Sequence, residues 1–304
     1  MEAVVADEDG FNQLIGRCSV EGSKIWVSCN PESPYHWFYV NFIKQAKQKN
    51  ILYIHFTMDD NPSLSETIKE EYRRMFSGVW KSRFIDGKWV IANGIIYDMF
   101  NDEKHIVKDS QIPYDEIDKW CIGVDYGTGN STCFLLLGRV DDIIYVVGEY
   151  YFAGRQEAQE QGDFEAQKTD LEYAEDMRQF IRDYYDLTGL NYRNIDIMVD
   201  PAANSFILQM RRLKMKSKRA VNDVLDGIRT VATYFGSDRL FISENCKNLI
   251  GEIHTYSWDE KAQARGVDSP KKENDHCCDA LRYGLMKLKS KDNISHATRN
   301  VGLW

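Results

Sequence analysis

Hydrophobic residues in the second half of the chain gather in short runs that end at turns or at acidic residues. Three consecutive runs predict strands joined by tight turns that contain Gly or Asp, at residues 120–125, 131–137 and 143–152. A fourth run covers residues 195–200, and the first and fourth runs each finish on an aspartate, Asp125 and Asp200. The pattern predicts a three-stranded meander followed by a strand that also ends in an acid.

Helical periodicity alternates with strands after the meander. The expected helices cover residues 170–187, a segment that starts at Pro201, and residues 221–234, 245–256 and 274–288, with a strand at residues 239–242. Acids at the ends of the first and fourth strands, in this order of elements, match a ribonuclease H-like layout. We therefore expect an α/β fold with a ribonuclease H-like mixed sheet flanked by helices.

The first hundred residues have a different pattern. Strands are predicted at 24–29 and 51–56, an aromatic-rich helix at 35–48, and a hairpin turn at Asp86-Gly87. A further helix runs to about Phe76, with Ser63 as its N-cap and Glu66 as the capping-box partner. Residues 101–118 are polar and patternless. The predicted division is residues 1–117, residues 118–290 and a tail at 291–304.

Composition restricts the class of protein without deciding it. The 304 residues are 43% hydrophobic, which is enough for a sizeable core. The longest apolar runs are far too short to span a bilayer, so no membrane association and an intracellular setting are expected. Seven cysteines without any C-x-x-C pair argue against both a disulfide framework and a structural zinc site.

The net charge of −9 argues against a nucleic-acid partner only if the charge is spread evenly. It is not, because residues 211–219 hold six cations and no acid. The six are Arg211, Arg212, Lys214, Lys216, Lys218 and Arg219. A strip of this kind can bind phosphates on an acidic protein, since the local field matters more than the total charge. The alternative is a solvated helix end and loop.

Residues 271–283 contain three ionisable side chains at the start of a predicted helix. Positions three or four apart share a helix face, so Asp279 lies beside both His276 and Asp275. The plain interpretation is an acidic helix start, which suits the helix dipole. The functional interpretation is a metal-binding or water-orienting face.

Two distant strand-end acids favour the functional interpretation. In a ribonuclease H-like sheet the two strands are neighbours, and the last helix crosses the same end, so Asp125, Asp200 and Asp279 would meet. Three converging carboxylates repel one another unless cations neutralise them. Two Mg²⁺ or Mn²⁺ ions roughly 3.5–4 Å apart do so and support phosphodiester hydrolysis. His276 would orient or deprotonate the water, or act as a further ligand.

The sequence also carries traces of an ATP site. Val4 to Glu8 is an apolar run that ends in Asp7 and Glu8, the pattern by which ATPases hold magnesium. Asn30 follows the predicted strand 24–29, at the strand end where nucleotide-binding sheets bind ligands. No G-x-x-x-x-G-K-[ST] sequence is present, so an ATPase that acts alone is not expected.

Several segments together resemble the large terminase subunit of tailed bacteriophages. They are residues 17–24, 29–31 with 34–37, 55–65, 123–127 (Gly-Val-Asp-Tyr-Gly), 199–203 (Val-Asp-Pro-Ala-Ala) and 275–283 (Asp-His-Cys-Cys-Asp-Ala-Leu-Arg-Tyr). The family joins an ATPase that drives DNA into a capsid to a ribonuclease H-like nuclease that cuts the concatemer. The resemblance implies double-stranded DNA, a small terminase subunit and a portal protein as partners, in the cytoplasm of an infected bacterium.

The resemblance also assigns roles. Asp125, Asp200 and Asp279 look like the family's metal-binding carboxylates and His276 like its active-site histidine. Asn30 looks like the coupling residue that senses the γ-phosphate, and Asp7-Glu8 resembles the magnesium-binding pair. Because the phosphate loop is missing, the chain looks like a partial P-loop-type ATPase region followed by a complete nuclease domain. ATP would then be used only if the other ATPase half is supplied.

Two alternatives remain open at this stage. Residues 125–132 also resemble the phosphate hairpin of sugar kinases and actin-like ATPases, which bind phosphate through backbone N–H groups. Those enzymes need further glycine loops that are not found after residue 200, and the helix with His276 and Asp279 has no role in them. The other alternative is a catalytically silent packaging protein that only docks on the portal.

Overall fold

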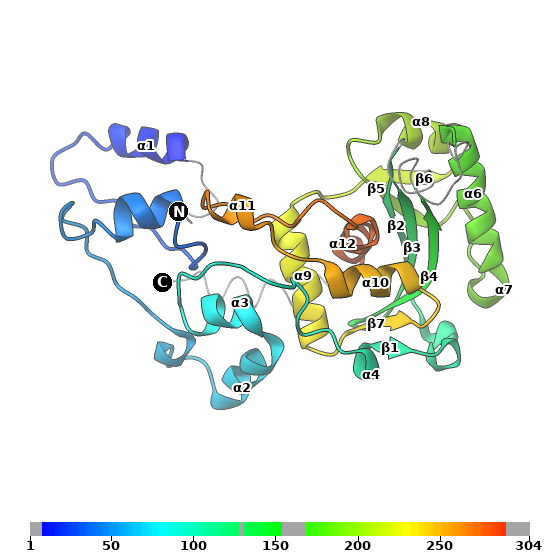
Figure 1. The fold of residues 1–304 in the computed structure, drawn as a ribbon, viewed down its shortest axis with the longest axis horizontal. Coiled ribbons are helices and arrows are strands. Elements are labelled where there is room, and N and C mark those ends of the chain that lie inside the picture. Colours follow the sequence, from blue (N-terminus) through cyan, green and yellow to red (C-terminus); the bar gives the residue numbers. More distant parts are fainter. Residues whose placement is uncertain (1–7, 128–130, 154–167, 290–304) are drawn as a thin grey trace. The chain divides into compact units, whose positions relative to one another are not determined.

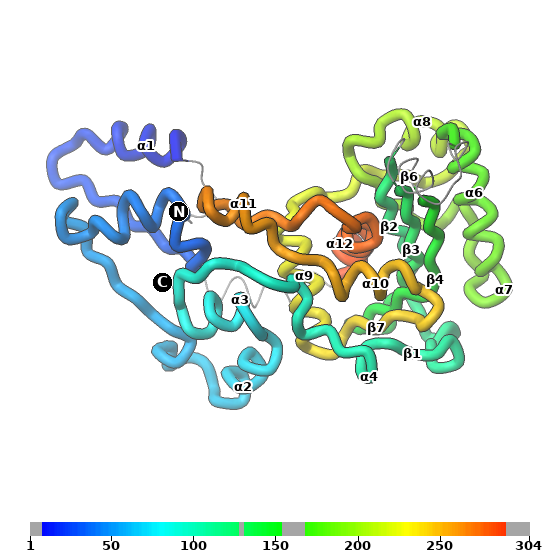
Figure 2. The backbone as a smooth tube through the Cα atoms, in the orientation of Figure 1, coloured from blue at the N-terminus to red at the C-terminus, as the bar shows by residue number. Residues whose placement is uncertain are grey.

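The computed structural model describes residues 8–127, 131–153 and 168–289. By internal contacts the chain divides into two compact units. The first comprises residues 1–94, 257–270 and 290–304, and the second comprises residues 95–256 and 271–289. The backbone leaves the second unit after Tyr256 and returns to it at Lys271, a path that can be followed in Figure 2. The functional division expected near residue 117 stays a prediction.

A mixed sheet forms the centre of the second unit, in the strand order β1-β7-β4-β3-β2-β5-β6 (Figure 1). Its seven strands are β1 (Ile106–Val107), β2 (Lys119–Asp125), β3 (Thr132–Val140), β4 (Ile143–Phe152), β5 (Asp196–Val199), β6 (Lys216–Arg219) and β7 (Leu240–Ser243). β2, β3 and β4 are antiparallel neighbours, and the remaining pairs are parallel. The predicted meander is confirmed.

The helices of the second unit follow the predicted order. They are α4 (Asp102–His105), α6 (Asp170–Asp183), α7 (Tyr185–Thr188), α8 (Asn204–Arg212), α9 (Val224–Gly236), α10 (Lys247–Thr255) and α12 (His276–Leu288), with short 3-10 turns at Asp109–Gln111 and Tyr114–Glu116. The predicted helix 170–187 is divided near Tyr184 into α6 and α7. β1 and β6 were not predicted.

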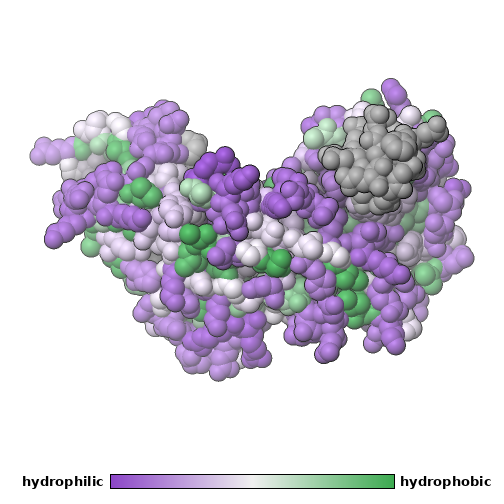
Figure 3. All heavy atoms as spheres, viewed as in Figure 1, coloured by the Kyte–Doolittle hydropathy of each residue, from purple (hydrophilic) through white to green (hydrophobic). Residues whose placement is uncertain are grey.

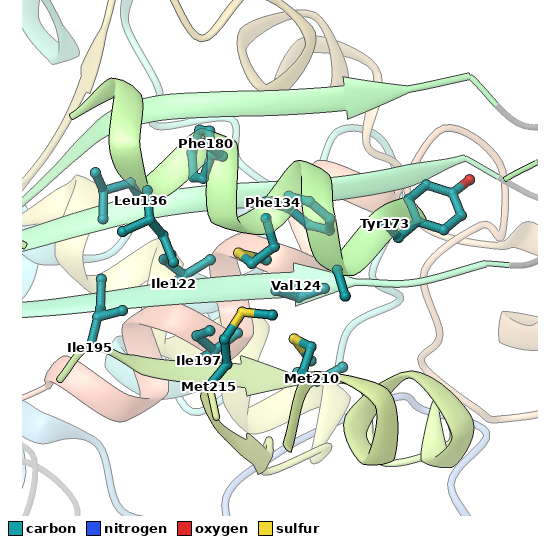
Figure 4. Close-up of a cluster of buried hydrophobic side chains, with 14 of the residues drawn as sticks. Ile122, Val124, Phe134, Leu136, Tyr173, Phe180, Ile195, Ile197, Met210 and Met215 are labelled. Atoms are coloured by element: carbon teal, nitrogen blue, oxygen red, sulfur yellow. The ribbon is translucent and has the colours of Figure 1, made fainter. Parts of the chain in front are cut away.

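One face of the sheet packs against α6 and α8. Figure 4 shows side chains of β2, β3 and β5 directed towards these helices, among them Phe134, Ile122 and Ile197. Met210 of α8 and Tyr173 of α6 close the cluster from the helical side. Burying such apolar surface, at about 25 cal/mol per Å², is the main force that fixes these elements together.

The other face holds α12 at very short range from the central strands. Gly123 of β2 makes this possible, since a Cβ built there would lie 2.0 Å from the backbone oxygen of Ala280. Gly284 of α12 does the same from the helix side, because its Cβ would lie 2.5 Å from Leu137 Cδ1. Two glycines therefore set the height of α12 above the strand that ends in Asp125.

The first unit is built from short helices. They are α1 (Glu8–Arg17), α2 (Glu66–Met75), α3 (Gly78–Trp80) and α11 (Glu260–Gln263), with π-helical turns at Tyr39–Ile43 and Lys81–Ile85 and a 3-10 turn at Met58–Asp60. Phe11 of α1 packs against Trp37, Phe38 and Phe42. The predicted helix 35–48 is reduced to its aromatic core, which has π-helical rather than α-helical geometry.

Four local predictions for this unit are wrong. Residues 24–29 and 51–56 are not strands, and Leu52 and Phe56 are 76% and 67% exposed. A strand needs a neighbour to satisfy its backbone N–H and C=O groups, and among the described residues these two segments have no ladder. Asp86-Gly87 ends a π-helical turn instead of a hairpin, and Ser65 rather than Ser63 caps α2.

The face of the molecule drawn in Figure 3 is largely polar. In the view of Figure 3, hydrophilic residues cover most of the face and hydrophobic residues form separate patches. Within the described ranges, no helix is long and apolar enough to cross a membrane. The predicted tail at 291–304 lies outside the described residues.

Candidate active site at the strand ends

Asp125 and Asp200 lie at the same edge of the sheet, the one formed by the carboxyl ends of β2 and β5. β2 and β5 are parallel neighbours with Val124 opposite Val199, so the next residue of each strand is one of the two acids. The N–H of Asp200 donates to the carbonyl oxygen of Val124 at 3.2 Å. The strand-end carboxylates, 75 positions apart in the sequence (200 − 125), therefore start from adjacent backbone positions.

α12 brings two further site residues to this edge. Nδ1 of His276, the first residue of the helix, lies 2.8 Å from Oδ2 of Asp125. Asp279 lies one turn later on the same helix and is 7% exposed. His276 and Asp125 thus make a direct contact between the helix and the strand end.

The electrostatics of Asp125 show that the acids sense one another. Burial raises the pKa of Asp125, and the charges of Asp279 and Asp200 raise it further, against the lowering effect of His276. For His276, burial alone would lower the pKa, but the hydrogen bond and charge of Asp125, together with Glu252 and Asp275, leave it raised. A raised imidazole pKa extends the protonated form of the ring to higher pH.

Two cations hold Asp279. Oδ1 of its carboxylate accepts a hydrogen bond from Nε of Arg282 at 3.2 Å and lies within ion-pair distance of Nη2, at 2.6 Å. Oδ2 lies 3.6 Å from the ammonium group of Lys272, which also bonds Asp275 at 3.2 Å. Arg282 is 1% exposed, so the guanidinium is a buried countercharge beneath the site.

Each of the three acids uses one carboxylate oxygen for an N–H donor of the protein. Oδ2 of Asp125 faces His276, Oδ1 of Asp279 faces Arg282, and Oδ1 of Asp200 accepts from the N–H of Ala202 at 2.8 Å. The donor set, carboxylates and an imidazole, is the kind that Mg²⁺ and Mn²⁺ bind. In their present orientations, however, the described residues contain no group of three or more His, Cys, Asp or Glu arranged to hold a metal ion.

Glu252 of α10 was not predicted as part of the site. Its Oε2 accepts hydrogen bonds from the N–H groups of Cys277 at 2.7 Å and Cys278 at 3.0 Å. Burial raises its pKa to about 7, although these N–H groups oppose the shift. No sequence signal distinguishes it, because a single Glu in a predicted helix resembles a solvent-facing residue.

The basic strip is divided by the structure. Lys216 and Lys218 both form ion pairs with the carboxylate of Asp196 at the start of β5, at 2.7 and 3.0 Å, and Lys287 of α12 forms a third at 3.0 Å. Burial raises the pKa of Asp196, but the three ammonium groups outweigh it and leave the pKa below its ordinary value. Two of the six cations are therefore engaged at the start of β5, the end of that strand opposite to Asp200.

The remaining cations of the strip lie closer to the site edge or in solvent. Arg219 is opposite Val199 in the ladder and bonds the side chain of Asn204. Arg211 donates to the carbonyl oxygen of Ser217 at 3.3 Å from Nε and 3.2 Å from Nη2. Arg212 and Lys214 are exposed. The structure thus leaves these two side chains directed to solvent.

The residues predicted for an ATP site belong to the first unit. Asp7 lies outside the described residues. Glu8 begins α1, and its Oε1 accepts a hydrogen bond from Nδ2 of Asn41 at 2.7 Å. Asn30 is half-buried in an irregular segment rather than at a strand end.

Comparison with known proteins identifies two matched regions. A family model described as phage terminase large subunit matches residues 2–79, and one described as terminase RNaseH-like domain matches residues 122–288. The second match covers more than half of the chain and agrees with the mixed sheet of the second unit. The expected ribonuclease H-like fold is confirmed.

Individual relatives agree with these matches. The terminase large subunit of Escherichia phage T5 is 28% identical over 250 residues, which are 79% of this chain and 52% of that protein. The large terminase of a thermophilic bacteriophage, solved in complex with ADP, is 43% identical, with a TM-score of 0.82, over 93% of this chain and 66% of that one. Another solved structure of the same thermophilic-phage protein gives a TM-score of 0.84 and covers 95% and 69% of the two chains. The chain spans about half the length of the curated relative.

Proposed function

Because this chain belongs to the phage large terminase family, we propose that it is an endonuclease of viral DNA packaging that cuts concatemeric double-stranded DNA by phosphodiester hydrolysis. The observation that supports this most is the common edge of β2 and β5. There the two strand-end acids lie on adjacent backbone positions and His276 contacts Asp125 directly. Such a polar, partly buried group of acids is suited to charge-driven catalysis.

We propose Asp125, Asp200 and Asp279 as the residues that would hold a pair of Mg²⁺ or Mn²⁺ ions. In the part of the chain that the structure describes, the second oxygen of each carboxylate accepts no hydrogen bond, so one ligand atom per residue is available. When bound, divalent ions neutralise the carboxylates, polarise the phosphate and lower the pKa of a water nucleophile. Lys272, which lies 3.6 Å from Oδ2 of Asp279, would have to give way to an ion bound at that oxygen.

His276 is proposed to act through its other ring nitrogen. Nδ1–H donates to Asp125, which fixes the ring orientation and leaves Nε2 for substrate or water. The neutral ring would accept a proton from water at Nε2, and the charged ring would donate from Nε2 to a phosphate oxygen. The raised pKa of His276 favours the second role near neutral pH.

Double-stranded DNA is proposed to contact the basic strip of residues 211–219 through its phosphates. Arg212 and Lys214 carry most of this proposal, since they are exposed. Lys216, Lys218 and Lys287 together outnumber the single charge of Asp196, so that group also keeps a positive surplus. Phosphate contacts of this kind give affinity without sequence preference.

The ATPase function is a separate proposal. The thermophilic-phage relative was solved with ADP and with ATP-γ-S, whereas these 304 residues lack a phosphate loop sequence. We therefore propose that ATP is hydrolysed only if the other half of an ATPase is supplied, with Asp7, Glu8 and Asn30 taking part in coupling. A small terminase subunit, a portal protein and the cytoplasm of the infected host are the proposed partners and setting.

A plasmid-cleavage assay tests the nuclease proposal. The parent should convert supercoiled DNA to nicked and linear forms with Mn²⁺ or Mg²⁺, and chelation should stop it. Asp125→Ala and Asp279→Ala should each reduce the rate by at least about 100-fold, because each removes a ligand of the ions. Asp186→Ala is the matched control, since it removes an exposed carboxylate on α7.

Two results would contradict the proposal. Equal cutting by the parent and both site variants would reject the site residues. A folded parent that does not cut with either metal would favour the silent packaging role instead.

A further inference from the structure

The first turn of α12 is not capped by its own N-cap residue. Asp275 makes no side-chain hydrogen bond to the turn, and its carboxylate bonds Lys272 instead. The first N–H groups of a helix have no partner within the helix, and buried ones need an acceptor from elsewhere. Cys277 and Cys278, which carry two of these N–H groups, are completely buried.

Glu252 supplies that acceptor from another helix. One carboxylate oxygen of Glu252 accepts both N–H groups, and the side chain is 7% exposed. A carboxylate at a helix N-terminus also interacts favourably with the helix dipole. α12 is therefore tied at its first turn to α10.

α10 is itself tied to the sheet in the same way. Glu149 of β4 accepts from the N–H of Asn248 at 3.0 Å and from the N–H of Leu249 at 2.7 Å. Two carboxylates in series thus connect β4 to α10 and α10 to α12. The connection ends at the residues that lie between His276 and Asp279.

This arrangement fixes the part of α12 that faces Asp125. The two amides held by Glu252 belong to the residues that directly follow His276 and directly precede Asp279. The His276 contact to Asp125, at 2.8 Å, tolerates little displacement of that turn. Gly123 lies against the next turn, where a Cβ would meet the backbone oxygen of Ala280.

We infer that Glu252 is a positioning residue of the site, which fixes the first turn of α12 so that His276 and Asp279 face Asp125. The inference rests on the proposed nuclease function. Glu252 bonds the backbone N–H groups of Cys277 and Cys278, and the inferred positioning acts through that backbone.

The test compares Glu252→Ala and Glu252→Gln with the parent in Mn²⁺-dependent cleavage of duplex DNA. Loss of the acceptor in Glu252→Ala should lower kcat about 10- to 100-fold and raise the Mn²⁺ concentration for half-maximal rate, as for other residues that orient ligands. KM for DNA should stay within about twofold, since phosphate contacts lie elsewhere. Glu252→Gln keeps an oxygen for both amides and should retain most of kcat.

A matched control and a second readout separate positioning from general stability. Glu172→Ala removes the carboxylate that caps α6, a helix with no site residue, and should leave kcat unchanged. Amide hydrogen exchange at Cys277 and Cys278 reports the cap without any cleavage, and it should accelerate in Glu252→Ala. If Glu252→Ala does not fold, Glu252→Asp carries the test, because it withdraws the carboxylate by one methylene.

The outcomes are distinguishable. Parent-like kcat and Mn²⁺ requirement in Glu252→Ala or Glu252→Asp, with faster exchange at the two amides, would overturn the inference and leave the nuclease proposal intact. A parent that does not cut with Mn²⁺ would overturn the nuclease proposal and the inference with it. If kcat falls as much in Glu172→Ala as in Glu252→Ala, the effect of Glu252 is one of general stability and the inference is overturned.

Discussion

The imidazole of His276 and the carboxylate of Asp125 form a 2.8 Å pair between residues 151 positions apart. The pair joins the start of α12 to the end of β2. Its charge state depends on both partners, because burial disfavours the charged forms and the mutual attraction favours them.

Asp125→Asn should lower the pKa of His276. The carboxylate raises that pKa both by its hydrogen bond and by its charge, and asparagine removes the charge. Titration of the ring signals by NMR, with His276→Gln to assign them, measures the change. An unchanged pKa would mean that the pair does not form in solution.

Glu252→Gln should change the pH dependence of stability in one direction. The pKa of Glu252 is about 7 in the fold, above its ordinary value of 4.5, so between these two values the folded state binds more protons than the unfolded state. The free energy of unfolding of the parent therefore falls as pH rises through this window. Glutamine does not titrate. The free energy of unfolding of the variant minus that of the parent should therefore grow from pH 4.5 to pH 7. Urea unfolding at several pH values measures it, and a constant difference would contradict the assigned cause.

Arg282→Met should cost about 3–5 kcal/mol of unfolding free energy, the range for removing one partner of a buried ion pair. The loss arises because the Asp279 carboxylate keeps its charge without its main countercharge. The double variant Arg282→Met/Asp279→Asn should recover part of the loss, since the uncompensated charge is gone. Denaturant unfolding of the parent, Arg282→Met, Asp279→Asn and the double variant gives the coupling energy. Additive losses would show that the two groups do not interact.

Gly123→Ala should displace α12, because its Cβ would meet backbone atoms that cannot move independently. A loss of at least about 1–3 kcal/mol is expected, together with reduced metal-dependent cleavage. The matched control is Gly251→Ala in α10, where a Cβ meets nothing within 4 Å. That change should stabilise the protein by roughly 0.5–1 kcal/mol, because alanine favours a helix interior. Equal thermal shifts in both variants would contradict the close approach.

Neutralising the exposed cations should affect DNA binding more than neutralising the paired ones. Arg212→Gln/Lys214→Gln should reduce the slope of log K against log salt concentration by about 1–2, if each side chain contacts one phosphate. Lys216→Gln/Lys218→Gln should reduce it less, since these lysines already bond Asp196. Binding measured from about 50 to 200 mM salt tests both. A larger change of slope in Lys216→Gln/Lys218→Gln than in Arg212→Gln/Lys214→Gln would place the bound DNA near the start of β5 instead.

The central meander of the sheet was predictable because its three strands are long and apolar. β2, β3 and β4 follow the predicted runs within a few residues, and buried sequences of this kind leave little freedom in the choice of element. β6 was missed, since Lys216 to Arg219 has a single buried residue, Ser217, and becomes a strand by pairing with β5.

The contacts around the site were less predictable than its acids. The strand-end positions of Asp125 and Asp200 follow from the sequence pattern, whereas Arg282 and Glu252 act through tertiary contacts that periodicity does not encode. The strands predicted at 24–29 and 51–56 have suitable residues, but a strand also depends on a partner, and propensity contains no information about one.

β6 has a further consequence as the outermost strand of the sheet. A border strand presents backbone donors and acceptors on which a second polypeptide can add, and lysine side chains there discourage such addition. Lys216 and Lys218 stand on this strand, with Asp196 offsetting part of their charge. Replacing them with uncharged residues would therefore be expected to make the protein self-associate, apart from any change in its affinity for nucleic acid.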